Sequence, residues 1–226
     1  MQVAMILAAG HGKRMHPLTL KTPKPLLSIG GKPIMEWHIE RLAEYGIKRI
    51  VINHSILGEQ IENYFGDGSP WGVEIVYSPE TQALETGGGI LKALPKIVDD
   101  PFIVVNGDVW CDFSFDKFTI DSNDLAQLVL VPNPDHNLDG DFSLEYGRVG
   151  SLGQGPNFTF SGIGIYRKKL FHNFPHSSFP LITALQKAIN KNRVGGILYE
   201  GNWIDIGTPE RLSIADDLIK STKFAT

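Results

Sequence analysis

Cysteine is nearly absent from this sequence of 226 residues, which contains only Cys111. A single cysteine forms no disulfide within the chain and builds no cysteine zinc site, so we expect Cys111 to be a small buried hydrophobic side chain in a reducing compartment. Long apolar runs are also missing, since none approaches the about 18 residues that a membrane-spanning helix needs. No basic leader precedes the first apolar run, residues 3–9, as it would in a secretory signal. These absences predict a cytoplasmic protein that does not enter the membrane.

An excess of basic residues, which nucleic-acid-binding proteins usually carry, is absent as well, because the formal net charge is −4. The charge is distributed unevenly. Residues 1–35 contain no Asp or Glu, and their cations are Lys13, Arg14, Lys21, Lys24 and Lys32. These cations alternate with glycines and prolines instead of following one face of a helix, which is typical of a loop. The segment therefore predicts a site for a small polyanion and not for nucleic acid.

The remaining composition is that of an ordinary globular domain, with 42% hydrophobic and 20% charged residues. In the first half, expected strands at residues 3–9, 47–53, 73–77 and 102–105 alternate with expected helices at 33–46, 57–66 and 87–94. This alternation requires crossover connections and hence a mainly parallel sheet. The second half has β-like segments at 126–131, 158–166 and 194–199 and helices near 180–190 and 209–220. We therefore predict one α/β domain over residues 1–226, with a predominantly parallel central sheet between helices and an antiparallel extension.

Residues 7–14, Leu-Ala-Ala-Gly-His-Gly-Lys-Arg, leave the first strand through small residues and reach two cations. Gly10 and Gly12 allow backbone N–H groups to approach a phosphate chain, and Lys13 and Arg14 supply positive charge. The pattern is not the dinucleotide-binding fingerprint, because Met15 stands where that pattern needs a glycine, and it is not a Walker A loop. Further along, Pro23 and Pro25 fix the backbone on both sides of Lys24. These residues predict a phosphate-binding loop with a positioned lysine.

Two aspartates follow or adjoin apolar segments in the rest of the chain. Asp108 closes the Asn-Gly-Asp sequence after residues 102–105, where ligands collect at the carboxyl ends of parallel strands. Asp205 lies between apolar residues in Trp-Ile-Asp-Ile-Gly, and a buried carboxylate there would need a cation or a metal as partner. Carboxylates together with phosphate oxygens are the ligands that Mg²⁺ prefers. We therefore expect Asp108 and Asp205 to hold a magnesium ion.

Residues 7–26 together resemble the signature of the sugar-phosphate nucleotidyltransferases, which make nucleotide sugars from a nucleoside triphosphate and a sugar 1-phosphate. Residues 84–90, 105–110 and 140–142 are most similar to the members of this family that transfer UMP from UTP to N-acetylmuramic acid 1-phosphate. The resemblance covers nearly the whole chain. It implies a Rossmann-like nucleotidyltransferase fold, a nucleotide-binding half at 1–110 and a sugar-binding half at 111–226.

The resemblance also implies a role for each matching residue. Catalysis would fall to Arg14, Lys24, Asp108 and Asp205, with magnesium held by the two aspartates. UTP would contact Ala8, Gly10, Gly12, Lys13, Arg14, Lys24, Thr81 and Gly87. The sugar 1-phosphate would contact Glu85, Asn106, Asp141 and Gly162.

The sequence departs from the family pattern at one position, and two alternative functions remain open. Many relatives hold the sugar phosphate with a second lysine, whereas residues 132–146 of this chain contain no Lys or Arg. The alternative within the family is a uridylyl-, thymidylyl- or guanylyltransferase for glucose or mannose 1-phosphate. The alternative outside catalysis is a nucleotide-sugar sensor on the same fold. A sensor would be expected to have lost Arg14, Lys24, Asp108 or Asp205, and all four are present.

Overall fold

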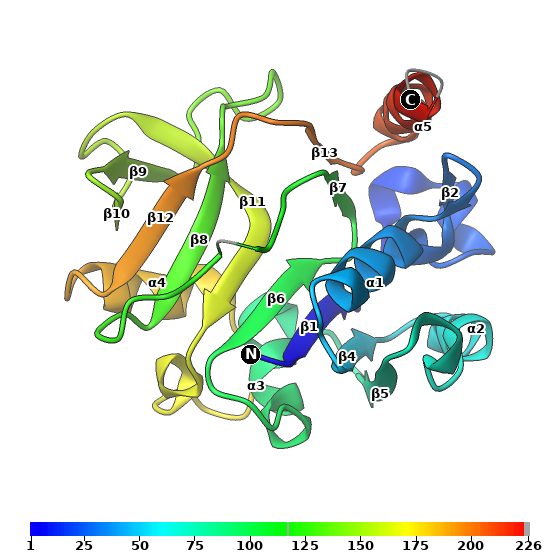
Figure 1. Cartoon of the computed structure of the whole chain (residues 1–226), viewed down its shortest axis with the longest axis horizontal. Helices are drawn as coiled ribbons and strands as arrows, with labels where there is room; N and C mark the ends of the chain where they lie inside the picture. The colour runs from blue at the N-terminus through cyan, green and yellow to red at the C-terminus, as the bar shows by residue number, and fades with distance from the viewer. Residues whose placement is uncertain (117, 224–226) are drawn as a thin grey trace.

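A computed structural model describes residues 1–116 and 118–223 of the chain. Within these residues a nine-stranded sheet runs through the molecule in the order β5-β4-β1-β6-β11-β8-β12-β10-β9 (Figure 1). Its strands are β1 (Val3–Ala8), β4 (Arg49–His54), β5 (Glu74–Pro79), β6 (Phe102–Asn106), β8 (Ala126–Val131), β9 (Phe142–Glu145), β10 (Arg148–Gly150), β11 (Asn157–Tyr166) and β12 (Val194–Leu198). The helices are α1 (Ile34–Glu44), α2 (Gly58–Phe65), α3 (Glu85–Ala93), α4 (Leu181–Ile189) and α5 (Pro209–Lys223).

The first four strands of the sheet, β5, β4, β1 and β6, are parallel. Successive side chains of a strand point to opposite faces of the sheet, and those of β1 are buried on both faces. Met5 packs in a cluster with side chains of α3 and α4, while Ala4 and Ile6 pack with those of α1 and α2. The continuous apolar run of residues 3–9 therefore reflects helices on both faces, as expected from the sequence.

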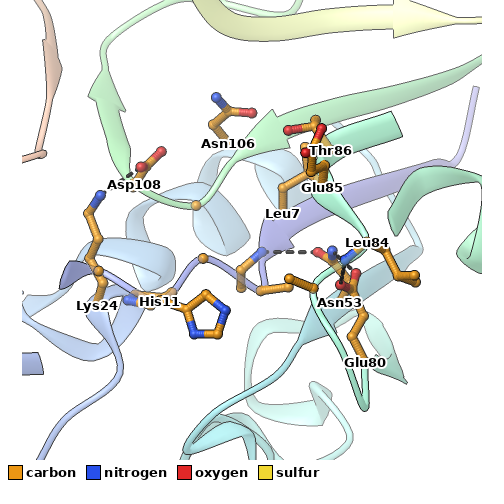
Figure 2. A pocket seen from close by; sticks show the side chains of 17 residues that line it. Leu7, His11, Lys24, Asn53, Glu80, Leu84, Glu85, Thr86, Asn106 and Asp108 are labelled. Carbon is orange, nitrogen blue, oxygen red and sulfur yellow. Dashed lines mark hydrogen bonds and ion pairs between the residues drawn. The ribbon is translucent and has the colours of Figure 1, made fainter. Parts of the chain in front are cut away.

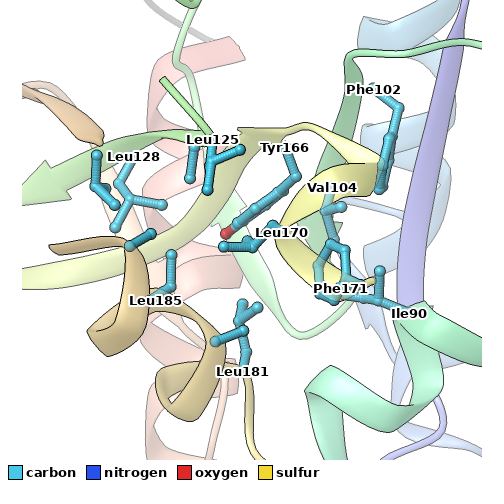
Figure 3. Close-up of a cluster of buried hydrophobic side chains, with 14 of the residues drawn as sticks. Ile90, Phe102, Val104, Leu125, Leu128, Tyr166, Leu170, Phe171, Leu181 and Leu185 are labelled. Atoms are coloured by element: carbon cyan, nitrogen blue, oxygen red, sulfur yellow. The ribbon is translucent and has the colours of Figure 1, made fainter. Parts of the chain in front are cut away.

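The second half extends the sheet in an antiparallel manner through β11, which pairs with β6, β8 and β9. β12 returns parallel to β8. In the core of this half, shown in Figure 3, Tyr166 of β11 packs in one cluster with Leu185 of α4, and Phe171 lies near Ile90 of α3. The mixed sheet with helices on its faces confirms the predicted fold class, including the antiparallel extension.

Two short ladders lie apart from the main sheet, and the sequence pattern did not predict them. β2 (Ser28–Ile29) pairs with β3 (Lys32–Pro33), and β7 (Val109–Cys111) pairs with β13 (Trp203–Asp205). Helix α5 is anchored to the first of these ladders, since the backbone N–H of Gly30 donates to Asp216 at 2.7 Å. Along residues 1–116 and 118–223, no helix is both apolar and long enough to cross a membrane.

Helix α1 holds β7 through its backbone carbonyls. The Nε2 atom of His38 lies 2.7 Å from the Val109 oxygen, and Arg41 donates to the Cys111 oxygen. Burial of the His38 ring lowers its pKa to about 4, because the charged imidazolium loses its hydration there. Burial also raises the pKa of the Cys111 thiol to about 12, which agrees with the expected hydrophobic role of this side chain.

His38 makes the stability of the fold sensitive to acid. Its pKa is lower in the folded than in the unfolded chain, so protons bind preferentially to the unfolded chain as the pH falls from about 6.5 to about 4. We expect the free energy of unfolding to drop by up to about 3 kcal/mol across this window through His38 alone. His38→Gln should make the urea-unfolding free energy less dependent on pH in this window, whereas His172→Gln, at an exposed position, should not. Equal pH slopes for wild type and His38→Gln would contradict the assignment.

Candidate functional site

A cavity of about 290 Å³ lies at the carboxyl ends of the parallel strands (Figure 2). The chain segments that follow β1, β5 and β6 all contribute to its wall. This is the position where ligands bind in open α/β sheets. Lys24 and Asp108 lie at one end of the view in Figure 2 and Asn53, Glu80 and Leu84 at the other. The cavity is lined by Leu7, Ala8, Ala9, Gly10, His11, Gly12, Lys24, Pro25, Asn53, Glu80, Ala83, Leu84, Glu85, Thr86, Asn106, Gly107 and Asp108.

The loop after β1 forms one wall of the cavity. Gly12 has a left-handed φ of +61°, and its carbonyl accepts a hydrogen bond of 2.8 Å from the Thr19 hydroxyl. A Cβ atom at Gly12 would lie 2.9 Å from the Thr19 methyl group, whereas one at Gly10 would meet no atom within 4 Å. Gly12 therefore maintains the turn, while Gly10 leaves open space at the cavity wall.

Lys24 is the buried cation of the site. It begins the short helix η3 (Lys24–Leu26) between Pro23 and Pro25, and its side chain is only 9% exposed. Its Nζ atom donates to Asp108 Oδ2 at 2.7 Å. A lysine this deeply buried needs an anionic partner, and Asp108 supplies it. The structure thus joins two predicted site residues, and Lys24 is a positioned cation as the flanking prolines indicated.

The β7–β13 ladder brings Asp205 next to Asp108. Asp205 pairs with Val109 in the register, and the backbone N–H of Ile206 donates to the Asp108 carbonyl at 2.7 Å. Partial burial raises the pKa of Asp205, and the charges of Arg211 and His136 oppose this rise. The negative charge of Asp108 also contributes to the raised pKa. The paired negative charges of Asp108 and Asp205 therefore favour the binding of a cation beside them.

The pair fits a hard divalent cation bound together with a phosphorylated ligand. Carboxylate oxygens are suitable donors for Mg²⁺, which commonly uses one or two carboxylates plus phosphate oxygens and water. Across the described parts of the chain, no three His, Cys, Asp or Glu side chains are grouped to hold a metal by themselves. The remaining ligands would therefore come from phosphate oxygens and water.

Three further nitrogen-bearing side chains, Arg211, His136 and Arg14, lie near this carboxylate pair. Arg211 Nη1 donates to Asp205 Oδ1 at 2.8 Å, and His136 Nε2 lies 2.9 Å from the same oxygen. Arg14 Nη2 lies close to Gly207, two residues beyond Asp205. Lys13, its neighbour, is exposed in the short helix η1 (Lys13–Met15). The loop after β1 and the segment after β13 thus converge on one site.

The other end of the cavity contains a buried amide and carboxylate that the sequence analysis missed. The backbone N–H of Ala8 donates to Asn53 Oδ1 at 3.0 Å, which leaves Asn53 Nδ2 to donate to Glu80 Oε1 at 2.7 Å. The backbone N–H of Leu84 donates to the second oxygen, Oε2, at 3.3 Å. Glu80 is 7% exposed and lines the cavity. The network fixes both side chains, and Glu80 presents hydrogen-bond acceptors to a ligand.

Thr81 and Gly87, both predicted to bind nucleotide, do not line this cavity. Thr81 is exposed and lines a separate hollow with Gln82, Lys92 and His176. Gly87 is buried, and a Cβ atom there would lie 2.4 Å from the Phe179 ring. Gly87 thus allows α3 to pack against the segment before α4, where the Gly88 N–H donates to the Phe179 carbonyl at 3.1 Å.

The predicted sugar-binding residues divide into two groups. Glu85 and Asn106 line the cavity, and Gly162, with a φ of +82°, makes room for the Asn106 side chain, since a Cβ atom there would lie 2.7 Å from Asn106 Nδ2. Asp141 instead accepts hydrogen bonds from the Phe160 N–H at 2.8 Å and from Asn137 Nδ2 at 3.2 Å. Asp141 therefore holds the residues before β9 onto β11.

The functional candidates that sequence reasoning missed share a weak local signal. No motif of several functional residues surrounds Asn53, Glu80, His136 or Arg211 in the sequence. For Asn53 and Glu80, the position at the end of an expected strand could have indicated a role, because the carboxyl ends of parallel strands meet at one edge of the sheet. His11 could have been found from its place between Gly10 and Gly12, and it lines the cavity.

Comparisons with known proteins agree with this geometry. Residues 3–142 match the family described as Nucleotidyl transferase. The chain is 48% identical to N-acetylmuramate alpha-1-phosphate uridylyltransferase of Neisseria meningitidis, over 97% of this chain and 99% of that protein. It is 42% identical to UTP–glucose-1-phosphate uridylyltransferase of Synechocystis, over 48% of this chain and 31% of that protein.

The fold is likewise similar to that of a solved structure. HddC from Yersinia pseudotuberculosis superposes with a TM-score of 0.80 at 27% identity, and the alignment covers 96% of this chain and 99% of HddC. A second HddC structure contains GMP-PN. These findings confirm the family resemblance inferred from residues 7–26.

The two glycines of the loop after β1 should respond differently to a methyl group. Gly12→Ala forces a left-handed φ and a contact with Thr19, so we expect a loss of about 1–2 kcal/mol in unfolding free energy. Gly10→Ala should leave stability nearly unchanged but weaken the binding of a nucleoside triphosphate about tenfold or more, because its methyl group enters the cavity wall. Thermal unfolding and calorimetric titration would separate the two effects. Unchanged triphosphate binding by Gly10→Ala would contradict the placement of the ligand.

Proposed function

The chain belongs to the nucleotidyl transferase family, and we propose that it transfers UMP from UTP to N-acetylmuramic acid 1-phosphate in a magnesium-dependent reaction. The products are UDP-N-acetylmuramic acid and pyrophosphate. The observation that carries the proposal is the convergence of Lys24, Asp108 and Asp205 at the end of a glycine loop that bears Lys13 and Arg14. The full-length similarity to the Neisseria uridylyltransferase supports the choice of substrates.

The chemistry requires that two polyanions meet. An oxygen of the sugar phosphate forms a bond to the α-phosphorus of UTP, the bond from that phosphorus to the bridging oxygen breaks, and pyrophosphate leaves with the electron pair. The attacking oxygen is already ionised, so no side chain needs to remove a proton. Repulsion between the phosphates is the main obstacle, and positive charge must offset it.

The cations of the site can supply this positive charge. We propose that Lys13 and Arg14 bind the β- and γ-phosphates and that Lys24 binds the α-phosphate region, where charge shifts during transfer. Asp108 and Asp205 would hold Mg²⁺, which when bound supplies Lewis-acid charge and orients phosphate oxygens. In the absence of a ligand, Asp108 keeps the Lys24 side chain in place at 2.7 Å.

Glu80 gives a physical reason to expect uracil, and not cytosine, as the base. Uracil carries an N–H group at N3, which a carboxylate oxygen accepts, whereas N3 of cytosine is itself an acceptor and would face Glu80 with like polarity. Together with Ala8 and Gly10, Glu80 would form the uracil site. We therefore propose UTP over CTP as the nucleotide. Thymine and guanine also carry a ring N–H, so thymidylyl- and guanylyltransferases remain the alternatives to be tested.

We also propose that residues 1–110 form the nucleotide-binding half and residues 111–226 the sugar-binding half. Asp205 would be the contribution of the second half to the metal site. Glu85 and Asn106, near the end of the first half, would surround the sugar together with Gly162. Because UTP is a nucleotide of the cell interior, we also propose a cytoplasmic location.

The direct test is release of pyrophosphate with Mg²⁺ and UTP from a panel of N-acetylmuramic acid, N-acetylglucosamine, glucose and mannose 1-phosphates, repeated with dTTP, CTP and GTP. Preference for UTP with N-acetylmuramic acid 1-phosphate is the expected result. Turnover with another pair would keep the reaction class and replace the substrates. No release from any pair, despite nucleotide binding, would favour the sensor.

Lys24 should matter more for turnover than for binding. Lys24→Ala removes a cation that meets charge developing in the transition state, so we expect kcat to fall about 10²- to 10³-fold. UTP affinity, measured by calorimetry, should fall much less, because several other cations hold the triphosphate.

Asp108→Asn and Asp205→Asn should each abolish most of the magnesium-dependent turnover, and wild-type rates in both would contradict the metal assignment.

Glu80 should control the choice between UTP and CTP. Glu80→Gln replaces an acceptor by an amide that can also donate, so we expect the ratio of kcat/KM for UTP over CTP to fall about 10- to 100-fold. Glu85→Gln is the matched control, because Glu85 is an exposed carboxylate of the same cavity. An equal change in both variants would contradict a specific role for Glu80.

A further inference from the structure

His136 lies beside the carboxylate pair although it comes from the connection between β8 and β9. Its Nε2 atom is 2.9 Å from Asp205 Oδ1, and its side chain is 42% exposed. Among the residues that the structure describes, Asp205 is the polar partner of the His136 ring. A ring held at one atom and open to solvent on the rest is available to a ligand at the site.

The connection that carries His136 is fixed in place by its own side chains. Asn133 Nδ2 donates to the carbonyls of Leu138 and Asn157 at 3.0 and 3.1 Å. The Thr159 hydroxyl donates to Asn133 Oδ1 at 3.0 Å and accepts from Asn137 Nδ2 at 3.1 Å. Residues 133–140 are therefore an irregular segment bound to β11 and not a loosely attached loop.

Asp141 completes this attachment. It accepts from Asn137 Nδ2 and from the Phe160 backbone, so it ties the residue next to His136 to the sheet. On the same side of the site, the indole N–H of Trp203 donates to the Ser161 carbonyl at 2.8 Å, next to Gly162. His136 thus lies between the sugar-facing strand β11 and Asp205. The cations assigned to UTP belong instead to the residues that follow β1.

The sugar side of the site is poor in positive charge. Residues 132–146 contain no Lys or Arg, and the guanidinium of Arg211 is already paired with Asp205. A sugar 1-phosphate brings a doubly ionised group to this side. In the neutral imidazole one ring nitrogen donates and the other accepts, so the N–H of Nε2, which here faces Asp205, is the group that would be shared with a phosphate oxygen.

We propose that His136 is a binding residue for the 1-phosphate of the sugar substrate and that Asn133, Asn137 and Asp141 are positioning residues for it. The inference rests on the proposed function, since it names the residue that meets the second substrate of that reaction. It also replaces the expected contact of Asp141 with the sugar by an indirect one, through the segment that Asp141 anchors.

The test compares His136→Ala and His136→Gln with the wild-type protein at saturating UTP. His136→Ala should raise the KM for the sugar 1-phosphate about tenfold, as expected for the loss of one hydrogen bond to a charged group. The KM for UTP and the Mg²⁺ concentration for half-maximal rate should change less than about twofold. His136→Gln keeps an N–H donor near the place of Nε2 and should recover most of the affinity. His172→Ala, on an exposed segment far along the chain, is the matched control.

A binding measurement without turnover accompanies the kinetics. Calorimetry should show that His136→Ala weakens UDP-N-acetylmuramic acid about tenfold and leaves UTP unchanged. Three results would each overturn the proposal: an unchanged sugar KM, a shift in Mg²⁺ requirement with no shift in sugar KM, or a His136→Gln variant as impaired as His136→Ala. Turnover by the wild-type protein in the same assay tests the proposed function separately, because the role of His136 is judged only relative to it.

Discussion

Asp108 and Asp205 are far apart in the sequence, and a ladder of three residue pairs between β7 and β13 brings them together. The other parts of the site depend on this ladder. Helix α1 supports one edge of β7 through His38 and Arg41, and the N–H of Ile206 fixes the Asp108 backbone. Asp108 in turn holds Lys24. Two carboxylates at one place repel each other, so the fold offsets this repulsion with Lys24, Arg211 and the neighbouring Arg14.

The charge distribution of the chain follows from the same constraint. The basic segment 1–35 supplies cations to one side of the carboxylate pair, and the acidic remainder of the chain supplies the carboxylates. Neither the cations nor the carboxylates would be stable in a partly buried cavity without the other, because an unpaired buried charge loses its hydration. Ion pairs between the two sets of side chains therefore stabilise the site.

The sequence predicted the strands and helices of the main sheet well, because their hydrophobic periodicity is strong. Residues 126–131 were placed within the strand that the structure shows, and the run 3–9 was correctly interpreted as buried on both faces. The β7–β13 ladder escaped prediction, since strands of three residues have too little periodicity to distinguish them from a loop. The packing of Gly87 against Phe179 could not be foreseen, because the two residues lie in distant segments of the sequence. Glu80 and His136 gave no local pattern, and only their positions in space indicate what they do.

The attachment of Glu80 has a consequence for how this family can change its substrates. Glu80, which follows β5, is fixed by Asn53 and Leu84, whereas the carboxylate pair of Asp108 and Asp205 is fixed by β7 and β13. The two supports share no hydrogen bond among the described residues beyond the sheet itself. Under the proposed function, recognition of the base and the transfer chemistry are therefore mechanically separable. A descendant of this protein could acquire a new nucleotide by altering a few side chains around residue 80, while the residues proposed to transfer the nucleotidyl group stay as they are.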